Sequence, residues 1–280
     1  MSRKFLDDGV EVRLVLNGGV GFDHLPVINN QYYEPGHMCL DPISGKRFVN
    51  EGSPDRPGSL FVNDQYNALI LHEKLEILPS TAGTGNTALD IVGTSAANGT
   101  VAFATTGGVT LTTPAVANNQ EITEPNTNSV WGTVSLIADS GLVFETQIVT
   151  GANITAAIIW AGLKLTNTST TATDDDQVFF RYQDTVNGGR FQVIDSNTGV
   201  DNANDSGVTV AVSTSYLLQI RIDNSRVPHY LINGELVYKG NALKVTTALK
   251  PFVGVQTTTT AAKAITIRHE RIVLPRAPIA

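Results

Sequence analysis

The chain has 280 residues, of which 16% are charged, and its formal net charge at pH 7 is −7. This charge content is too low for a charge-rich disordered chain or a coiled coil, and an acidic chain without clustered lysine and arginine is unsuited to binding nucleic acid through its phosphates. The single cysteine, Cys39, excludes an internal disulfide. No apolar run reaches the roughly 18 residues of a membrane-spanning helix, and Asp7 and Asp8 interrupt the segment where a secretory signal would have its apolar core. We therefore expect a protein made in a reducing cytoplasm, with neither nucleic acid nor a membrane as its partner.

Threonine divides the chain into two compositional parts. All 32 threonines lie at or after Thr81, and the change coincides with a stretch of proline, serine and glycine at residues 79–85. A composition shift at such a stretch is typical of a domain boundary. We therefore predict a first domain over residues 1–80, a linker over 81–85, a second domain over 86–274 and a C-terminal tail over 275–280.

One passage of the first domain predicts a β-hairpin. Pro35-Gly36 precedes an apolar segment, Ser44-Gly45-Lys46 is a turn sequence, and Phe48-Val49 begins a second apolar segment. The passage resembles the corresponding part of small β-barrel capsid decoration proteins. The resemblance implies a small N-terminal β-barrel that docks on a capsid and mediates oligomerisation.

The second domain contains segments in which apolar and polar residues alternate, which is typical of strands with one buried face. The clearest are 142–148, 216–223 and 264–268, and a shorter pair lies at 101–103 and 109–112. The alternation places Leu142, Phe144, Thr146 and Ile148 on one face, and it places Leu218, Ile220 and Ile222 on another. Glu145, which alternates with these apolar residues, is expected to face solvent.

The turn sequences of the second domain agree with this interpretation. Asn233-Gly234 separates two apolar runs and predicts a tight hairpin, because both residues tolerate a positive φ. Further turns are predicted at 187–189, 197–199 and 204–207. Many short strands joined by such turns predict an all-β fold with a two-sheet sandwich or jelly roll in the second domain.

The order of segments over residues 86–274 resembles the concanavalin-A-like (laminin-G-like) jelly rolls that are common in structural proteins of tailed phages. The passage from Tyr216 through Asp223 to Tyr230-Leu231-Ile232-Asn233-Gly234 is the most specific part of the resemblance. Both resemblances together imply a virion protein on the outer capsid surface: a decoration or cement protein that binds the major capsid protein, stabilises a phage head and forms a homotrimer. The alternative is a carbohydrate-binding module on a phage tail or capsid, with a host-surface glycan as its partner.

No catalytic motif is complete in the sequence. The segment from His72 to Glu76 carries glutamate where a zinc protease helix needs its second histidine, no serine has a Gly-x-Ser-x-Gly frame, and residues 17–22 lack the lysine of a phosphate-binding loop. Glucanases on the concanavalin fold need paired carboxylates on one strand. The glutamates of the second domain are not at that spacing; they are Glu121, Glu124, Glu145, Glu235 and Glu270. We therefore expect no enzymatic activity, no catalytic residues and no cofactor.

Several residue types would suit a binding site without forming a motif. Two clusters of aspartate and asparagine contain enough oxygen ligands for Ca²⁺; they are Asp174-Asp175-Asp176 and the set Asp195, Asn197, Asp201, Asn202 and Asp205. Because such residues are also ordinary in turns, we predict no metal site. The five histidines are expected at the surface or at interfaces; they are His24, His37, His72, His229 and His269. Aromatic residues that could stack on sugars are Trp131, Trp160, Tyr182 and Tyr238, of which Trp160 lies in an apolar run and is expected in the core.

Overall fold

The computed structural model describes residues 2–7, 10–15, 38–40, 47–50, 60–63, 68–81, 88–126, 136–137, 141–165, 176–244 and 248–275. Its contacts divide the chain into two units, Met1–Ala68 and Leu69–Ala280, which are described separately. In the described part, the elements are β-strands apart from one short 3-10 turn at Ala96–Asn98 (η3). None of the described helices has the length and apolar character of a membrane span.

The first unit contains two small groups of strands. β1 (Ser2–Asp7) pairs antiparallel with β2 (Val10–Val15), and β3 (Met38–Leu40), β4 (Arg47–Asn50) and β5 (Leu60–Asn63) form a separate three-stranded sheet. Cys39 on β3 lies opposite Phe48 on β4, which confirms the pairing of the predicted hairpin. Its turn lies outside the described residues. A closed barrel requires every strand edge to be paired, and the described strands do not show such closure, so the predicted N-terminal barrel is not confirmed.

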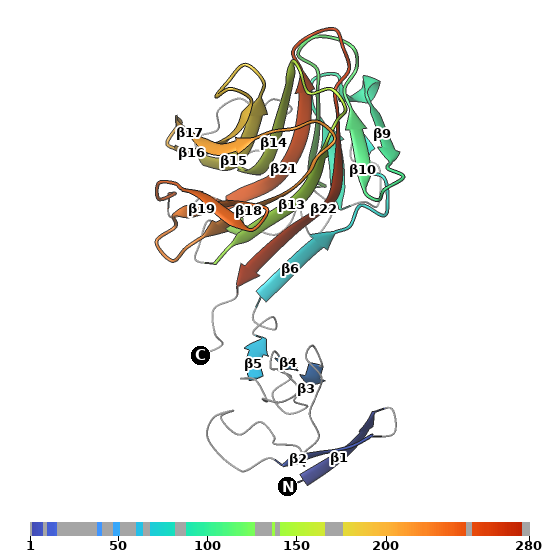
Figure 1. The fold of residues 1–280 in the computed structure, drawn as a ribbon, viewed down its shortest axis with the longest axis vertical. Helices are drawn as coiled ribbons and strands as arrows, with labels where there is room; N and C mark the ends of the chain where they lie inside the picture. The colour runs from blue at the N-terminus through green and yellow to red at the C-terminus, as the bar shows by residue number, and fades with distance from the viewer. Residues whose placement is uncertain are drawn as a thin grey trace. The chain divides into compact units, whose positions relative to one another are not determined.

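The division between the units falls earlier than the linker expected at residues 81–85. β6 (Ala68–Glu73) pairs with β22 (Ala264–Pro275) and so belongs to the second unit, as Figure 1 shows. Leu71 on this strand and Leu75 just after it are buried in the core of that unit. The threonine content changes after these residues, but hydrophobic burial decides where the folded unit begins. The contacts thus place the division between the two units at Ala68/Leu69.

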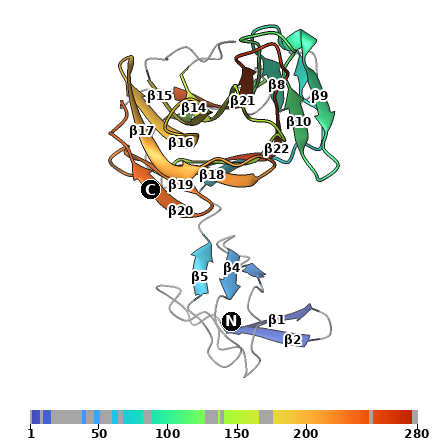
Figure 2. The ribbon, with the colours of Figure 1, turned by 45° about the horizontal axis from the view of Figure 1, so that its top comes forward.

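The second unit is a sandwich of two β-sheets (Figure 2). The eight-stranded sheet has the order β20 (Glu235–Lys239), β19 (Pro228–Ile232), β18 (Ser215–Ile222), β13 (Val143–Thr150), β22, β10 (Val109–Thr112) and β9 (Thr100–Phe103), with β6 also paired to β22. The nine-stranded sheet has the order β17 (Val200–Thr209), β16 (Arg190–Asn197), β15 (Asp176–Gln183), β14 (Ala157–Lys164), β21 (Ala248–Thr257), β11 (Gln120–Pro125), β8 (Leu89–Val92) and β7 (Ser80–Thr81), with β12 (Leu136–Ile137) also paired to β21. Neighbouring strands along both sheets are antiparallel, apart from the parallel pair β7–β8. The predicted all-β sandwich is therefore confirmed.

Alternating side chains of both sheets form the core between them. On β13 the buried residues are every second one, as predicted for Phe144, Thr146 and Ile148. On β18 the predicted inward residues are also buried. Aromatic rings join the two sheets: the Phe180 ring on β15 lies 5.4 Å from the Tyr230 ring on β19, edge to face. The Tyr230 hydroxyl donates a hydrogen bond of 2.6 Å to the carbonyl of Ile194, so this buried polar group has a partner.

Most of the predicted turns are confirmed, and one is not. Asn233 and Gly234 have φ values of 53° and 86° between β19 and β20, as a type I′ hairpin requires. Residues 187–189 and 198–199 also adopt positive φ between paired strands. Residues 204–207, expected as a turn, instead lie inside β17, where the register against β16 shifts between Arg190 and Gln192. Gly207, with φ of 75°, accommodates a bulge at this edge strand rather than a reversal of the chain.

Candidate functional site

An open groove with a volume of about 600 Å³ lies against the outer face of the eight-stranded sheet. Its chemistry comes from six side chains on four strands and one adjoining segment; they are His72, Lys74, Phe103, Gln147, Arg268 and His269. Ile148 and Ile267, the neighbours of Gln147 and Arg268 in sequence, are fully buried in the core. Because successive side chains of a strand point to opposite faces, the groove residues project away from the core.

A β-bulge brings two consecutive basic side chains to this groove. Gln147 on β13 pairs with His269 on β22, whereas the next residue, Ile148, pairs with Ile267, so Arg268 has no opposite residue. Ile267 is buried, and Arg268 and His269 are both partly exposed. The Thr146 hydroxyl donates a hydrogen bond of 2.8 Å to the carbonyl of His269 beside the bulge. Bulges redirect side chains in this way and are frequent next to functional sites.

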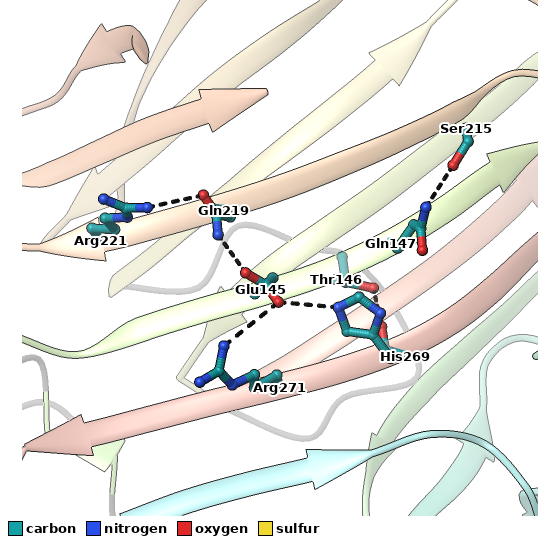
Figure 3. A network of polar contacts seen from close by, with 8 residues as sticks. All are labelled: Glu145, Thr146, Gln147, Ser215, Gln219, Arg221, His269 and Arg271. Carbon is teal, nitrogen blue, oxygen red and sulfur yellow. Dashed lines mark hydrogen bonds and ion pairs between the residues drawn. The ribbon is translucent and has the colours of Figure 1, made fainter. Parts of the chain in front are cut away.

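A polar network on the same face of the sheet supports His269 (Figure 3). Glu145 on β13 lies 3.2 Å from the Nε2 atom of His269 and 3.9 Å from the guanidinium of Arg271. Gln219 on β18 donates a hydrogen bond to the same carboxylate and accepts one of 3.3 Å from Arg221. The hydrogen bond from His269, followed by those of Gln219 and the charge of Arg271, lowers the pKa of Glu145 to about 2 despite its burial. Glu145 is therefore ionised at neutral pH.

The placement of Glu145 beside Gln219 partly corrects the expectation that Glu145 faces solvent. Both lie on the outer face of the sheet as the alternation predicts, but their side chains cover each other. Gln219 is 8% exposed and the Glu145 side chain is 15% exposed, so neither is a freely solvated residue. The alternation identifies the face of a strand, whereas the contacts across neighbouring strands determine how much water remains on that face.

The two histidines of the groove come from strands far apart in sequence. The His72 ring on β6 lies 5.5 Å from the His269 ring on β22, with an angle of 84° between the ring planes. Burial lowers the pKa of His72, and the positive charges of His269, Arg271 and Lys74 lower it further, while Glu145 acts in the opposite direction. At neutral pH the His72 imidazole is therefore uncharged and offers one hydrogen-bond donor and one acceptor.

The aromatic residue at the groove is one that the sequence analysis did not select. Phe103, at the end of the edge strand β9, is 55% exposed. Trp160 and Tyr182, by contrast, are each 3% exposed, which confirms the core position of Trp160 and excludes both as sugar-stacking surfaces. Trp131 lies outside the described residues, and Tyr238 is partly buried. The available sequence signal for Phe103 is its position at a strand end, directly before the turn that contains Gly107 and Gly108.

Three other glutamates of the sandwich are buried in its interior. Glu121 and Glu270 are fully buried, and burial raises the pKa of each to about 8. The Thr123 hydroxyl lies 2.6 Å from the Glu270 carboxyl group. Glu124 forms a buried ion pair with Lys164, whose ammonium group lies 5.1 Å from the centre of the Phe252 ring. Perturbed carboxyl groups can mark functional sites, but Glu121 and Glu270 are out of reach of any ligand.

The acidic residues considered for Ca²⁺ are bound to protein donors. Asp195 accepts hydrogen bonds from Asn202 and Asn241, Asp201 accepts one from Gln177, and Asp205 pairs with Arg190. Over the described stretches, no group of three or more histidine, cysteine, aspartate or glutamate side chains is arranged to hold a metal ion. Asp174 and Asp175 lie outside these stretches.

The remaining histidines are distributed between the surface and the undescribed part. His229 on β19 lies 3.0 Å from Asp223, and both line a second, smaller groove of about 310 Å³ together with the exposed Leu236. Hydrogen bonds from His229 and from the backbone of Val227 lower the pKa of Asp223 to about 2. His24 and His37 lie outside the described residues.

No protein-family model and no curated protein sequence matches the chain. Among solved structures, a protein of unknown function from Shewanella oneidensis MR-1 is similar with a TM-score of 0.53 and 12% sequence identity, over 76% of this chain and 90% of that one. The carbohydrate recognition domain of Emp46p is similar in its potassium-bound form, with a TM-score of 0.50 and 7% identity over 77% of this chain and 99% of that one. A mutant of the same domain gives a TM-score of 0.51 and 8% identity over the same fractions of the two chains. At such identities the likeness concerns the fold: the chain has a concanavalin-like jelly-roll β-sandwich.

Proposed function

We propose that this protein binds a carbohydrate in the groove on the eight-stranded sheet and does not cleave it. The observation that carries the proposal is the position of Phe103, an exposed aromatic ring beside the planar polar side chains of Gln147 and His269. A sugar ring has an apolar face of C–H groups that packs on an aromatic ring, while its hydroxyl groups need hydrogen-bond donors and acceptors at the edge. Binding sites commonly combine an apolar surface with a few placed polar groups in this way.

The polar groups of the groove can both donate a hydrogen bond to a sugar hydroxyl and accept one from it. The Gln147 amide nitrogen donates to Ser215 at 3.0 Å, which orients the amide and leaves its carbonyl oxygen to accept from a ligand. His72 supplies a neutral imidazole with one donor and one acceptor. The network of Glu145, Arg271 and Gln219 holds His269 in place before any ligand arrives, and such preorganisation lowers the entropic cost of binding.

The carboxyl groups near the groove favour binding over hydrolysis. Glycosidases use two carboxyl groups that flank the scissile bond at separations of about 5–9.5 Å. Of the residues that line the groove, one carries a carboxylate, Glu76. Glu145, which contacts His269 of the groove, has a pKa of about 2 and cannot act as a general acid at neutral pH. Glu121 and Glu270, which hold protons at neutral pH, are fully buried.

Carbohydrate binding is the alternative that the sequence left open beside capsid decoration. The Emp46p domain is described as a carbohydrate recognition domain, and a shared fold hosts many functions, so that likeness is background to the proposal and the groove is its basis. The virion location, the major capsid protein as partner and the homotrimer stay predictions from the sequence. A capsid decoration protein that also binds a host glycan would be consistent with both capsid decoration and carbohydrate binding.

The experiment is a binding titration of the full chain against a panel of oligosaccharides, repeated with Phe103→Ala. An aromatic contact contributes about 0.5–1.5 kcal/mol beyond burial, so we expect this substitution to weaken binding about tenfold. Leu236→Ala is the matched control, because Leu236 is 57% exposed and lies beside the smaller groove. Binding that survives Phe103→Ala and is lost in Leu236→Ala contradicts the assigned groove, and absence of binding to every saccharide contradicts the function.

A further inference from the structure

The charge of the groove is opposite to that of the chain. The whole chain has a formal charge of −7, yet the lining of the groove contains the cations Lys74 and Arg268 against the single carboxylate of Glu76, and two histidines that add positive charge when they are protonated. A concentration of positive charge in a concave surface attracts an anionic ligand, because the walls of low dielectric constant focus the field.

The nearby carboxylates among the described residues do not pair with Lys74 or Arg268. Glu145 is engaged by His269, Arg271 and Gln219, and the Glu73 carboxylate accepts a hydrogen bond of 2.8 Å from the backbone of Leu75. Within the described residues, neither Lys74 nor Arg268 lies in an ion pair. The Nε atom of Arg268 is shielded from water and has no hydrogen-bond partner among those residues. An arginine and a lysine that line the same groove, and that lie in no ion pair among the described residues, can bind a negatively charged group.

His72 reports the sign of the electrostatic potential at this position. After burial, which is the largest cause, three positive groups lower its pKa: His269, Arg271 and Lys74. Glu145 is the one group that acts in the opposite direction. Burial by itself disfavours a charge of either sign, but the part of the lowering that comes from these positive groups reflects a positive potential, which favours an anion at the same place.

From these charges and contacts, and resting on the proposed function, we infer that the ligand is an anionic saccharide whose sugar rings carry a carboxylate or a sulfate. The acidic group lies against Lys74 and the Arg268 guanidinium, and the apolar face of the ring packs on Phe103. The bulge on β22 is the device that makes this possible, because a regular strand would turn either Arg268 or His269 into the core.

The test compares ligands that differ in charge and not in ring structure. Calorimetric titration of the full chain uses an oligogalacturonate with its uncharged methyl ester, and a sulfated oligosaccharide with its unsulfated parent. We expect at least one anionic form to bind about tenfold more tightly than its uncharged counterpart, with a difference that shrinks as salt is added. The sulfated and carboxylated arms identify which acidic group is preferred, and inorganic sulfate shows whether the anion alone is sufficient.

The matched variants are Lys74→Gln and Arg268→Gln, with Lys239→Gln as the control because Lys239 is also exposed but lies by Asp223. The first two should remove the preference for the anionic form, so that each variant binds the acid and its methyl ester with similar affinity; thermal melting checks that Arg268→Gln remains folded. Equal affinity for acid and ester overturns this inference while the proposed function stands. Failure of every saccharide to bind overturns the proposed function itself, and tight binding of inorganic sulfate alone overturns the saccharide ligand.

Discussion

Glu270 is an acid enclosed between the two sheets, and its replacement by glutamine removes a titrating group while preserving its shape. The side chain is fully buried, and its Oε2 atom has no hydrogen-bond partner among the described residues. The Thr123 hydroxyl lies 2.6 Å from Glu270 Oε1 and 3.0 Å from the carbonyl oxygen of Val253. One hydroxyl proton cannot serve both acceptors. A protonated Glu270 resolves this conflict, because it donates to Thr123, which then donates to Val253.

The pH dependence of stability follows from the raised pKa. The folded state holds a proton on Glu270 up to about pH 8, whereas the ordinary pKa is 4.5. Between these values the folded state binds more protons than the unfolded state, so the free energy of unfolding falls as pH rises through this window. At about 1.4 kcal/mol per pKa unit, the contribution of this one group reaches up to about 5 kcal/mol, and buried Glu121 adds a loss of the same sign.

The assay is urea unfolding of the full chain followed by tryptophan fluorescence between pH 5 and pH 9. Glu270→Gln should flatten the pH dependence and raise the midpoint above that of the unmodified chain at pH 8–9, with little difference at pH 5. Glu235→Gln, at an exposed position on β20, should leave the profile unchanged. If the stability of the unmodified chain rises from pH 5 to pH 8, or if Glu270→Gln retains the full slope, the assignment of a neutral buried acid is refuted.

Three further predictions concern the network, the packing and the groove. Glu145 has a pKa of about 2, so the stabilisation that its charge provides is complete above pH 4.5 and is lost as the pH falls toward 2. In Glu145→Gln, the free energy of unfolding should therefore decrease by about 1–3 kcal/mol less over this pH range than in the unmodified chain, measured by acid unfolding with circular dichroism. A Cβ atom at Gly162 would lie 2.3 Å from a backbone oxygen of β15, so Gly162→Ala should lower the free energy of unfolding by about 3 kcal/mol or more. The control Gly188→Ala should lower it by about 1 kcal/mol, because the strain there comes from the φ of 63° alone. Melting temperatures that fall equally in the two variants would contradict this prediction. Finally, an anion bound beside His72 raises the pKa of that imidazole, whose charged neighbours are His269, Arg271, Lys74 and Glu145. The affinity for an acidic saccharide should therefore increase about three- to tenfold from pH 8 to pH 5. If the His72→Gln variant keeps this pH dependence, another group is responsible for it.

The local sequence was sufficient to predict much of the β-sandwich. The alternation around Phe144 and around Ile220 predicts which residues face the core, because a strand has a period of two wherever it lies. Asn233-Gly234 predicts its hairpin because the required positive φ depends on these two residues themselves. Residues 204–207 have the same composition as a turn and nevertheless lie in a strand, because Asn204 and Asp205 pair with β16 and the residues that follow them form a bulge there.

The groove depends on contacts that no local pattern contains. His72 and His269 meet because β6 pairs with β22 from the opposite end of the second unit, and Arg268 joins them through a one-residue shift in register that only the partner strand defines. Phe103 is exposed because β9 is the last strand of its sheet, whereas Trp160, the stronger candidate by residue type, lies on a central strand and is buried. The sequence by itself therefore determined the fold class and the strand faces, which follow from backbone periodicity and turn chemistry. The tertiary structure decided the site, because strand order, sheet edges and the bulge set which polar groups lie together and which are covered.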